Sequence, residues 1–392
     1  MEPLTGKRAR DESTLYHASS VSDSKRAKPL SQKEMRDRER RRIEALYADL
    51  PVLPPKLPAP DYLVDGQITY SKDNASLEFY AACVHGDLDK VRSYTESSSR
   101  PQADLQYGLE KAAHGFHVEV VCHFMREQST KLHTRVFETE DKTHSQGLNI
   151  FLYGSPKLFE LLRELLDNGW HPNQVLGTAP QKVALHYPCC IKDLSILQLL
   201  LQHGADPSIS RHPYPSPAFL HFPHEAPLAR KCGEVLNMAA STGSTEAIDL
   251  LLSYGAKLEY GSPLHRLAGY SYAADDSGQA SRYAMADHLI NVGDDINGLR
   301  NVGDVVKPYS IIPFGGSFQT TPLSHATALG DWAFVEWLLE KGADPEAAGG
   351  RAFSTKDVLY YGRPERTAEE YKGRLLKLID KTQNKGQTVQ SG

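Results

Sequence analysis

LLLQHGADPSIS occupies residues 199–210, and WLLEKGADPEAA, nearly the same twelve letters, occupies residues 337–348. Three further segments have the same shape, with an apolar run before a Gly and a polar stretch after it: LLDNGWHPNQ (165–174), LLSYGAKLEY (251–260) and LINVGDDING (289–298). Such recurrence indicates a chain of 392 residues built from repeated supersecondary units rather than around one continuous core.

The glycines of these five segments set the period of the repeat. They are Gly169, Gly204, Gly255, Gly293 and Gly342, which are 35, 51, 38 and 49 residues apart. Each step is one unit of about 33 residues plus an insertion. The apolar run before each Gly predicts a helix that ends there, because Gly enters the left-handed conformation at little steric cost. We therefore expect positive φ at Gly204, Gly255 and Gly342.

A second, shorter helix is expected before each apolar one. LNMAASTG (236–243) and LSHATALG (323–330) carry paired small residues that suit close helix packing. Ser262 and Thr321 can cap such a helix with their hydroxyl groups, and the Pro after each of them fits the first helical turn. The repeated unit is therefore two helices joined by a tight turn.

The pattern resembles the ankyrin repeat. The matching stretches are SPLHRLA (262–268), TPLSHA (321–326), AASTGSTEAIDLLLSYGA (239–256) and GDWAFVEWLLEKGADP (330–345). Weaker copies are ACVHGDLDKV (82–91) and AAHGFHVEVVCHFM (112–125), where Phe116 stands in the place of a Gly. The resemblance implies an all-α repeat solenoid, an ankyrin-repeat stack of about seven helix–turn–helix units with hairpin fingers over residues 74–350. Neighbouring units must stack, because one unit cannot bury its apolar stripe alone.

The segments outside the repeats differ in composition. Residues 351–381 predict an amphipathic C-terminal helical cap with Leu375, Leu376 and Ile379 turned inward, and residues 382–392 predict a polar tail. Residues 1–60 have few apolar side chains and many Ser, Lys, Arg and Pro, which predicts a disordered basic arm.

The basic arm carries two clusters that resemble a bipartite nuclear-import signal, KRAR (7–10) and KRAK (25–28). The arm has a net charge of +5 over residues 1–42, although the whole chain is at −5. The resemblance implies that an import receptor binds the arm and that the protein is located in the nucleus. The alternative is that the arm is a solvated basic tail without an import function. The candidate import residues are Lys7, Arg8, Arg10, Lys25, Arg26 and Lys28.

A short helix is predicted at about residues 31–50, where Pro51 stops it. Its RERRRI (38–43) resembles the start of a fungal basic-leucine-zipper basic region, but the Asn and spaced Arg residues that read bases are missing, and no leucine heptads follow. The remaining charge predicts weak, non-specific contact with nucleic acid. The basic-helix candidates are Arg36, Arg38, Arg40, Arg41 and Arg42. Arm and repeats together resemble fungal basic-region/ankyrin regulators of secondary-metabolite gene clusters, with a degraded basic region.

Two long insertions, 210–231 and 298–318, extend the predicted fingers and mix Pro with aromatic residues. They can be surface loops packed on the stack or loops that bind a partner. Trp332, on the last apolar helix, occupies a position predicted to be half exposed. The partner-binding candidates are Tyr214, Phe219, Phe222, Tyr309, Phe314 and Trp332.

Motifs for catalysis and ligand binding are missing from the sequence. It contains no G-x-G-x-x-G, P-loop, G-x-S-x-G or H-E-x-x-H motif, and its five Cys never form C-x-x-C. We predict reduced thiols, no enzyme activity, no cofactor and no metal; His212, His221 and His224 are expected to pack within their loop. No apolar run is long enough to span a membrane, and no signal peptide is expected.

Two functions remain open from the sequence. The first is a non-enzymatic nuclear transcription coregulator whose repeat stack binds a protein partner, a transcription factor, with control of a fungal secondary-metabolite gene cluster as the implied role. The second is a cytoplasmic ankyrin adaptor or scaffold without a transcriptional role.

Overall fold

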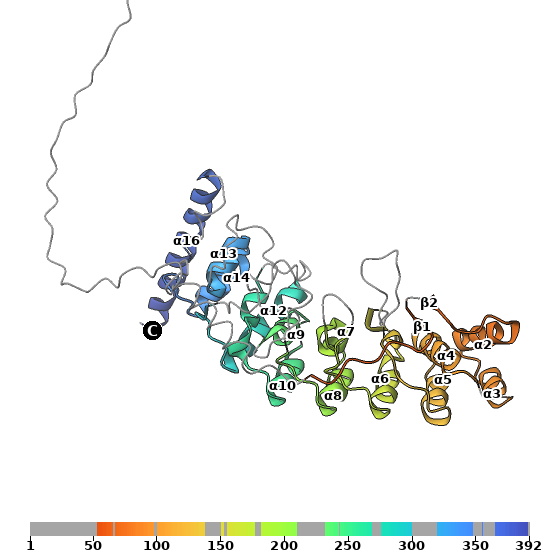
Figure 1. The fold of residues 1–392 in the computed structure, drawn as a ribbon. Helices are drawn as coiled ribbons and strands as arrows, with labels where there is room; N and C mark the ends of the chain where they lie inside the picture. Colours follow the sequence, from red (N-terminus) through yellow and green to blue (C-terminus); the bar gives the residue numbers. More distant parts are fainter. Residues whose placement is uncertain are drawn as a thin grey trace, which may run out of the picture. The chain divides into compact units, whose positions relative to one another are not determined.

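The structure is a computed structural model that describes residues 53–65, 67–97, 100–137, 150–152, 155–176, 182–209, 232–242, 244–268, 276–299, 320–347, 355 and 365–390. The chain divides into two units, Met1–Ala45 and Leu46–Gly392, and all described residues belong to the second. Within this second unit the helices alternate between two rows (Figure 1). The predicted import residues and the predicted helix at 31–50 lie outside the described residues.

The first row holds the leading helix of each repeated pair. They are α2 (Asn74–His85), α4 (Gln102–His114), α7 (Pro188–Lys192), α9 (Glu234–Thr242), α11 (Pro263–Arg266) and α13 (Pro322–Leu329). Within the row α2 packs on α4, α7 on α9, α9 on α11 and α11 on α13. Thr321 caps α13 through a hydrogen bond from Ser324 N–H, and Pro322 occupies the first turn, as the sequence predicts.

The second row holds seven helices in the described part of the chain. They are α3 (Leu88–Ser97), α5 (Val118–Cys122), which continues as the π-helical turn His123–Glu127, α6 (Leu158–Asp167), α8 (Leu194–Gln202), α10 (Thr245–Ser253), α12 (Asp276–Asn291) and α14 (Trp332–Glu340). The last five of them, α6 to α14, are each followed by one of the repeated glycines. The contacts α3–α5, α5–α6, α6–α8 and α8–α10 connect this row, and each of these helices except α6 follows a first-row helix against which it packs.

Short elements complete the described fold. The antiparallel strands β1 (Leu63–Val64) and β2 (Gln67–Ile68) precede α2, and a long helix, α16 (Glu365–Gln390), follows the repeats. Single 3-10 turns connect the helix pairs: Thr134–Val136, Ile150–Leu152, Ala184–His186 and Leu258–Tyr260.

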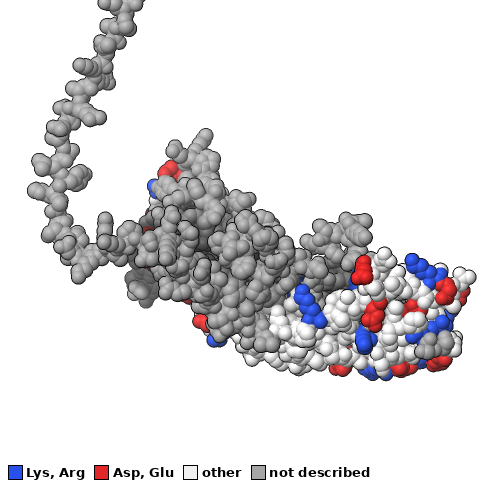
Figure 2. Space-filling model, viewed as in Figure 1, with Lys and Arg blue, Asp and Glu red and all other residues white. Residues whose placement is uncertain are grey.

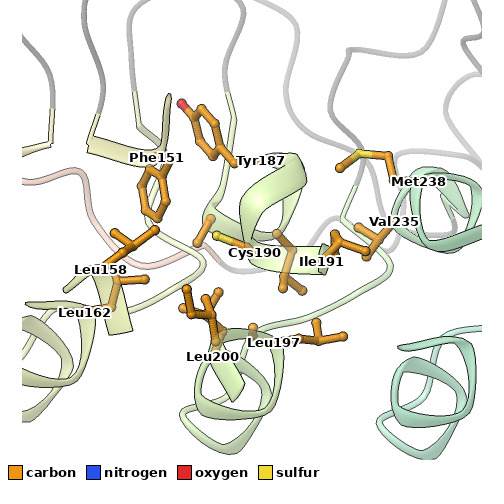
Figure 3. Close-up of a cluster of buried hydrophobic side chains, with 14 of the residues drawn as sticks. Phe151, Leu158, Leu162, Tyr187, Cys190, Ile191, Leu197, Leu200, Val235 and Met238 are labelled. Carbon is orange, nitrogen blue, oxygen red and sulfur yellow. The ribbon is translucent and has the colours of Figure 1, made fainter. Parts of the chain in front are cut away.

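One hydrophobic core runs through both rows of helices. Figure 3 shows its middle part, where α6, α7, α8 and α9 meet. Leu162, Leu197, Leu200 and Val235 are each 0% exposed there. Because each of these helices supplies side chains to its neighbours, a single pair could not bury its own apolar stripe.

The predicted positive φ at the helix-ending glycines is confirmed. Gly204 has φ 86°, Gly255 92° and Gly342 93°. The tight turns inside the pairs are also left-handed, with φ 73° at Gly86 and 75° at Gly330, and Phe116 adopts φ 55° where the other turns use Gly. Burial of the Phe116 ring, which is 7% exposed, offsets the strain of this conformation.

Replacing Gly255 by Val is expected to lower the free energy of unfolding by about 1–3 kcal/mol. A Cβ atom at this position meets nothing within 4 Å, so the cost comes from the left-handed backbone and not from a clash. Gly373 is the matched control, because its Cβ space is equally open but it lies inside helix α16. Urea unfolding of both variants checks this: equal stabilities for Gly255→Val and Gly373→Val would contradict the role of the backbone.

The C-terminal helix differs from its sequence prediction at one side chain. Helix α16 runs from Glu365 to Gln390 and so continues through the predicted polar tail. Leu375 is fully buried and Ile379 packs against the core, but Leu376 is 41% exposed, so its predicted inward orientation is wrong. Leu375 and Ile379 are one helical turn apart on the same face, whereas Leu376 is rotated by about 100° from Leu375.

Candidate partner-binding surface

Most of the residues predicted to bind a partner, an import receptor or nucleic acid lie outside the described residues. These are Lys7, Arg8, Arg10, Lys25, Arg26, Lys28, Arg36, Arg38, Arg40, Arg41, Arg42, Tyr214, Phe219, Phe222, Tyr309 and Phe314. Trp332 is the one candidate that the structure describes, and the remaining assignments stay predictions.

Trp332 is the first residue of α14 and is half-buried. The Tyr371 ring meets it edge-on with 4.9 Å between centroids, and the Arg374 guanidinium lies 4.9 Å from its ring centroid. Both neighbours belong to α16. The indole therefore holds the C-terminal helix on the stack, and its contact with a partner stays a prediction.

A buried polar cluster fixes the start of the described chain on α4. Tyr62, just before β1, is 2% exposed, and its hydroxyl donates a hydrogen bond to the Glu110 carboxylate. Glu110 is fully buried and also pairs with Lys111 at 3.1 Å and with Arg135 at 3.5 Å. The His133 ring lies edge-on to the Tyr62 ring with centroids 5.9 Å apart. This arrangement anchors the chain immediately before the first repeat.

The ionisation of the cluster follows from its burial and its charges. Burial lowers the pKa of His133 to about 4, so the folded protein keeps this ring neutral. Burial raises the pKa of Glu110, but the Lys111 charge and the Tyr62 hydrogen bond outweigh it, and the net shift of the pKa is downward. Both groups have a lower pKa folded than unfolded, so both contribute stability that is lost as the pH falls. For His133 the loss runs from about pH 6.5, its usual pKa, down to about pH 4.

A second buried ion pair connects the last described repeats. Arg282, on α12, is 1% exposed, and its guanidinium donates to both Asp331 oxygens, at 2.6 and 3.2 Å. Asp331 also caps α14 by accepting a hydrogen bond from Phe334 N–H. The same guanidinium lies 4.7 Å from the centroid of the Phe334 ring. One carboxylate therefore caps helix α14 and neutralises the buried charge of Arg282.

Residues 53–59, here called the leading segment, lie against the stack instead of belonging to a free arm. Figure 1 shows this segment as the red-orange trace that passes from the side of α8 toward β1. Leu53 packs on Val175, Val183 and Ile209, and Leu57 packs on the main core. From the sequence this segment is predicted to be part of the disordered arm, because its Pro-rich composition, without helical or strand periodicity, is typical of disorder.

The leading segment also has two hydrogen bonds to the stack through its carbonyl groups. Gln174 Nε2 donates to Pro55 O at 2.9 Å, and Thr134 N–H donates to Pro58 O at 3.0 Å. On the face shown in Figure 2, uncharged side chains (white) cover most of the described surface at the α2–α8 end of the stack, with charged ones scattered among them. The described surface thus accommodates an extended polypeptide.

Among the described residues, no group of three or more His, Cys, Asp or Glu side chains could hold a metal ion. All five cysteines are described, and each is a free thiol. No described helix is long and apolar enough to cross a membrane.

The comparison with protein families agrees with this geometry. The model of the family "Ankyrin repeat" matches residues 182–211, which contain α7, α8 and the left-handed turn at Gly204. The chain carries an ankyrin-repeat stack. Its all-α repeat solenoid with paired helices is the fold class that the sequence predicts, and the ankyrin-repeat fold is typically a non-enzymatic protein-interaction domain.

Solved structures similar to the stack are also ankyrin-repeat domains. That of human ASB11 is 16% identical, covers 76% of this chain and 96% of its own, and gives a TM-score of 0.34. That of Bcl-3, a member of the IkappaB protein family, is 18% identical, covers 69% of this chain and 97% of its own, and gives a TM-score of 0.38. No curated protein matches this chain in a search with its sequence.

Proposed function

We propose that this chain is a non-enzymatic nuclear transcription coregulator whose ankyrin-repeat stack binds a protein partner, a transcription factor. The observation that carries the protein-binding part is the seating of residues 53–59 on the stack, with two leucines in apolar contacts and two carbonyl groups accepting hydrogen bonds. A surface that holds one extended polypeptide has the chemistry to hold another.

The nuclear part of the proposal is supported by the sequence of the arm. The clusters KRAR and KRAK and the net charge of +5 over residues 1–42 suit an import receptor, which binds Lys and Arg through carboxylates and aromatic faces. The resemblance to fungal basic-region/ankyrin regulators supports a role in a secondary-metabolite gene cluster. The degraded basic region favours a coregulator over an autonomous DNA-binding factor.

Removing the basic clusters is expected to move the protein from the nucleus to the cytoplasm. The variant replaces Lys7, Arg8, Arg10, Lys25, Arg26 and Lys28 by Ala in a full-length fluorescent fusion, and the measurement is the nuclear-to-cytoplasmic ratio. Ala at Arg36, Arg38, Arg40, Arg41 and Arg42 is the control, because it removes nearly as much positive charge from the same arm. A wild-type fusion that stays in the cytoplasm would instead support the adaptor or scaffold function.

A further inference from the structure

We infer that the surface beneath the leading segment is a binding site for an extended, proline-rich peptide of a protein partner, and that the segment fills this site in cis. The site, here called the segment track, consists of Thr134, Gln174, Val175, Val183 and Ile209. The inference deepens the proposed partner binding and rests on it, since it assigns the chemistry of the partner's peptide.

The apolar end of the segment track is a small cluster of buried side chains. Val175, Val183 and Ile209 are 7%, 1% and 1% exposed and form a cluster separate from the main core, with Leu53 packed on it. Leu57, four residues further on, packs on the main core. The surface beneath the segment therefore holds two leucines four residues apart, Leu53 on the track and Leu57 on the adjacent main core.

The polar contacts of the track are two donors that point at main-chain carbonyls. Gln174 Nε2 donates a hydrogen bond to Pro55 O, and Thr134 N–H donates one to Pro58 O. The Gln174 side chain is positioned for this, because it is 7% exposed and its Oε1 accepts a hydrogen bond from His171 N–H. Donors directed at carbonyls suit proline, which offers a carbonyl and no N–H and holds an extended conformation at low entropic cost.

The leading segment is held more weakly than the chain just after it. Pro55, Lys56, Pro58 and Ala59 are exposed. Pro60 and Tyr62, in contrast, are buried, and the Tyr62 hydroxyl is bonded to Glu110. The segment can therefore leave its track while the anchor at Tyr62 stays in place. A partner peptide with leucines and prolines at the same spacing competes with it for the same contacts.

The strength of this competition follows from effective concentration. A tethered segment acts at roughly millimolar concentration. If its sequence as a free peptide binds the track with a Kd of about 10–100 μM, the segment occupies the track in about 90–99% of molecules. A free peptide should then bind the wild-type chain about 10–100-fold more weakly than a chain whose own segment cannot bind.

The test uses the full-length chain and a fluorescent peptide, PVLPPKLPAP, which is the sequence of residues 51–60. The receptor variant is Leu53→Ser/Leu57→Ser, which keeps the track but removes both leucines of the cis segment. Fluorescence anisotropy should show binding about 10–100-fold tighter to this variant than to wild type. Replacing both leucines of the peptide by Ser should abolish binding, and adding Gln174→Ala to the receptor variant should weaken it. Equal peptide affinity for wild type and variant, or no binding to a folded variant, would overturn the inference.

Hydrogen exchange of the wild-type chain gives a second test that does not depend on any variant. The Thr134 amide, bonded to Pro58 O at 3.0 Å, should exchange at least tenfold faster than the Thr69 amide, bonded to Tyr62 O at 2.7 Å, because the segment detaches without its anchor. Equal protection of the two amides would show a permanent structural element and refute the cis-ligand inference. Such a result would leave the proposed nuclear coregulator function untouched. Conversely, a wild-type fluorescent fusion found outside the nucleus would refute the coregulator function but would not bear on peptide binding at the segment track.

Discussion

Replacing Asp331 by Ala is expected to lower the free energy of unfolding by about 3–5 kcal/mol, because the change removes the carboxylate to which the buried Arg282 guanidinium donates two hydrogen bonds. The same substitution removes the side chain that caps α14 through Phe334 N–H. The Arg282 side chain is 1% exposed and the Asp331 side chain 15%, so water cannot replace the carboxylate at the guanidinium without opening the contact between α12 and α14.

Urea unfolding followed by Trp fluorescence measures this effect, because two of the three tryptophans, Trp332 and Trp337, lie on α14. Asp287→Ala is the matched control: Asp287 pairs with Lys341, but both side chains are about 40% exposed, and the expected loss is below about 1 kcal/mol. Arg282→Met/Asp331→Asn should cost less than Asp331→Ala alone, since no unpaired charge remains in the interior. Similar losses for Asp331→Ala and Asp287→Ala would contradict the importance of burial.

Replacing Glu110 by Ala is expected to destabilise the opposite end of the stack by about 2–4 kcal/mol. Glu110 is 0% exposed, and without it the buried Tyr62 hydroxyl loses its acceptor and Lys111 its counter-ion. The anchor of the leading segment is lost with it. Glu110→Gln should retain part of the stability, because the amide oxygen can still accept the Tyr62 hydrogen bond.

Hydrogen exchange by residue is the suitable measurement for Glu110→Ala. In a stack of nearest-neighbour contacts, amides of α2 and α4 should lose protection first, while those of α13 and α14 keep theirs. Glu119→Ala, at an exposed position of the adjacent helix α5, should change stability by less than about 0.5 kcal/mol. Uniform loss of protection along the whole stack would show that the repeats unfold as one unit and would refute the local account.

The repeated elements could be predicted from sequence because their rules are local. A left-handed helix end needs Gly, and the apolar run before it has helical periodicity, so Gly204, Gly255 and Gly342 were assigned from their neighbours alone. Phe116 shows that the turn geometry persists without Gly when burial of the side chain offsets the strain. At α16 the apolar pattern alone predicts Leu375, Leu376 and Ile379 on one buried face, but Leu376 is exposed because it is rotated away from the other two.

The polar contacts of the stack could not be predicted, since they join residues far apart in sequence. Arg282 and Asp331 are 49 residues apart, and Gln174 and Pro55 are 119 apart. From the sequence alone, the side chains of Arg282 and Asp331 could equally have faced solvent. The Pro-rich leading segment has no periodicity that would indicate its contact with the stack. The two leucines spaced four apart among prolines in LPPKLP were the available signal, because isolated apolar residues in a polar stretch suggest a docking segment.

The central claim is that specific recognition belongs to the repeat stack and not to the basic arm. The most direct measurement is binding of the purified full-length chain to a random duplex DNA library at several salt concentrations. The account predicts Kd values on the order of 10⁻⁴–10⁻⁶ M at physiological salt, a steep fall of affinity with added salt and no enriched sequence, because contacts with phosphates carry no sequence information. A nanomolar, salt-tolerant complex with one enriched sequence would contradict the account and identify the chain as a direct DNA-binding factor.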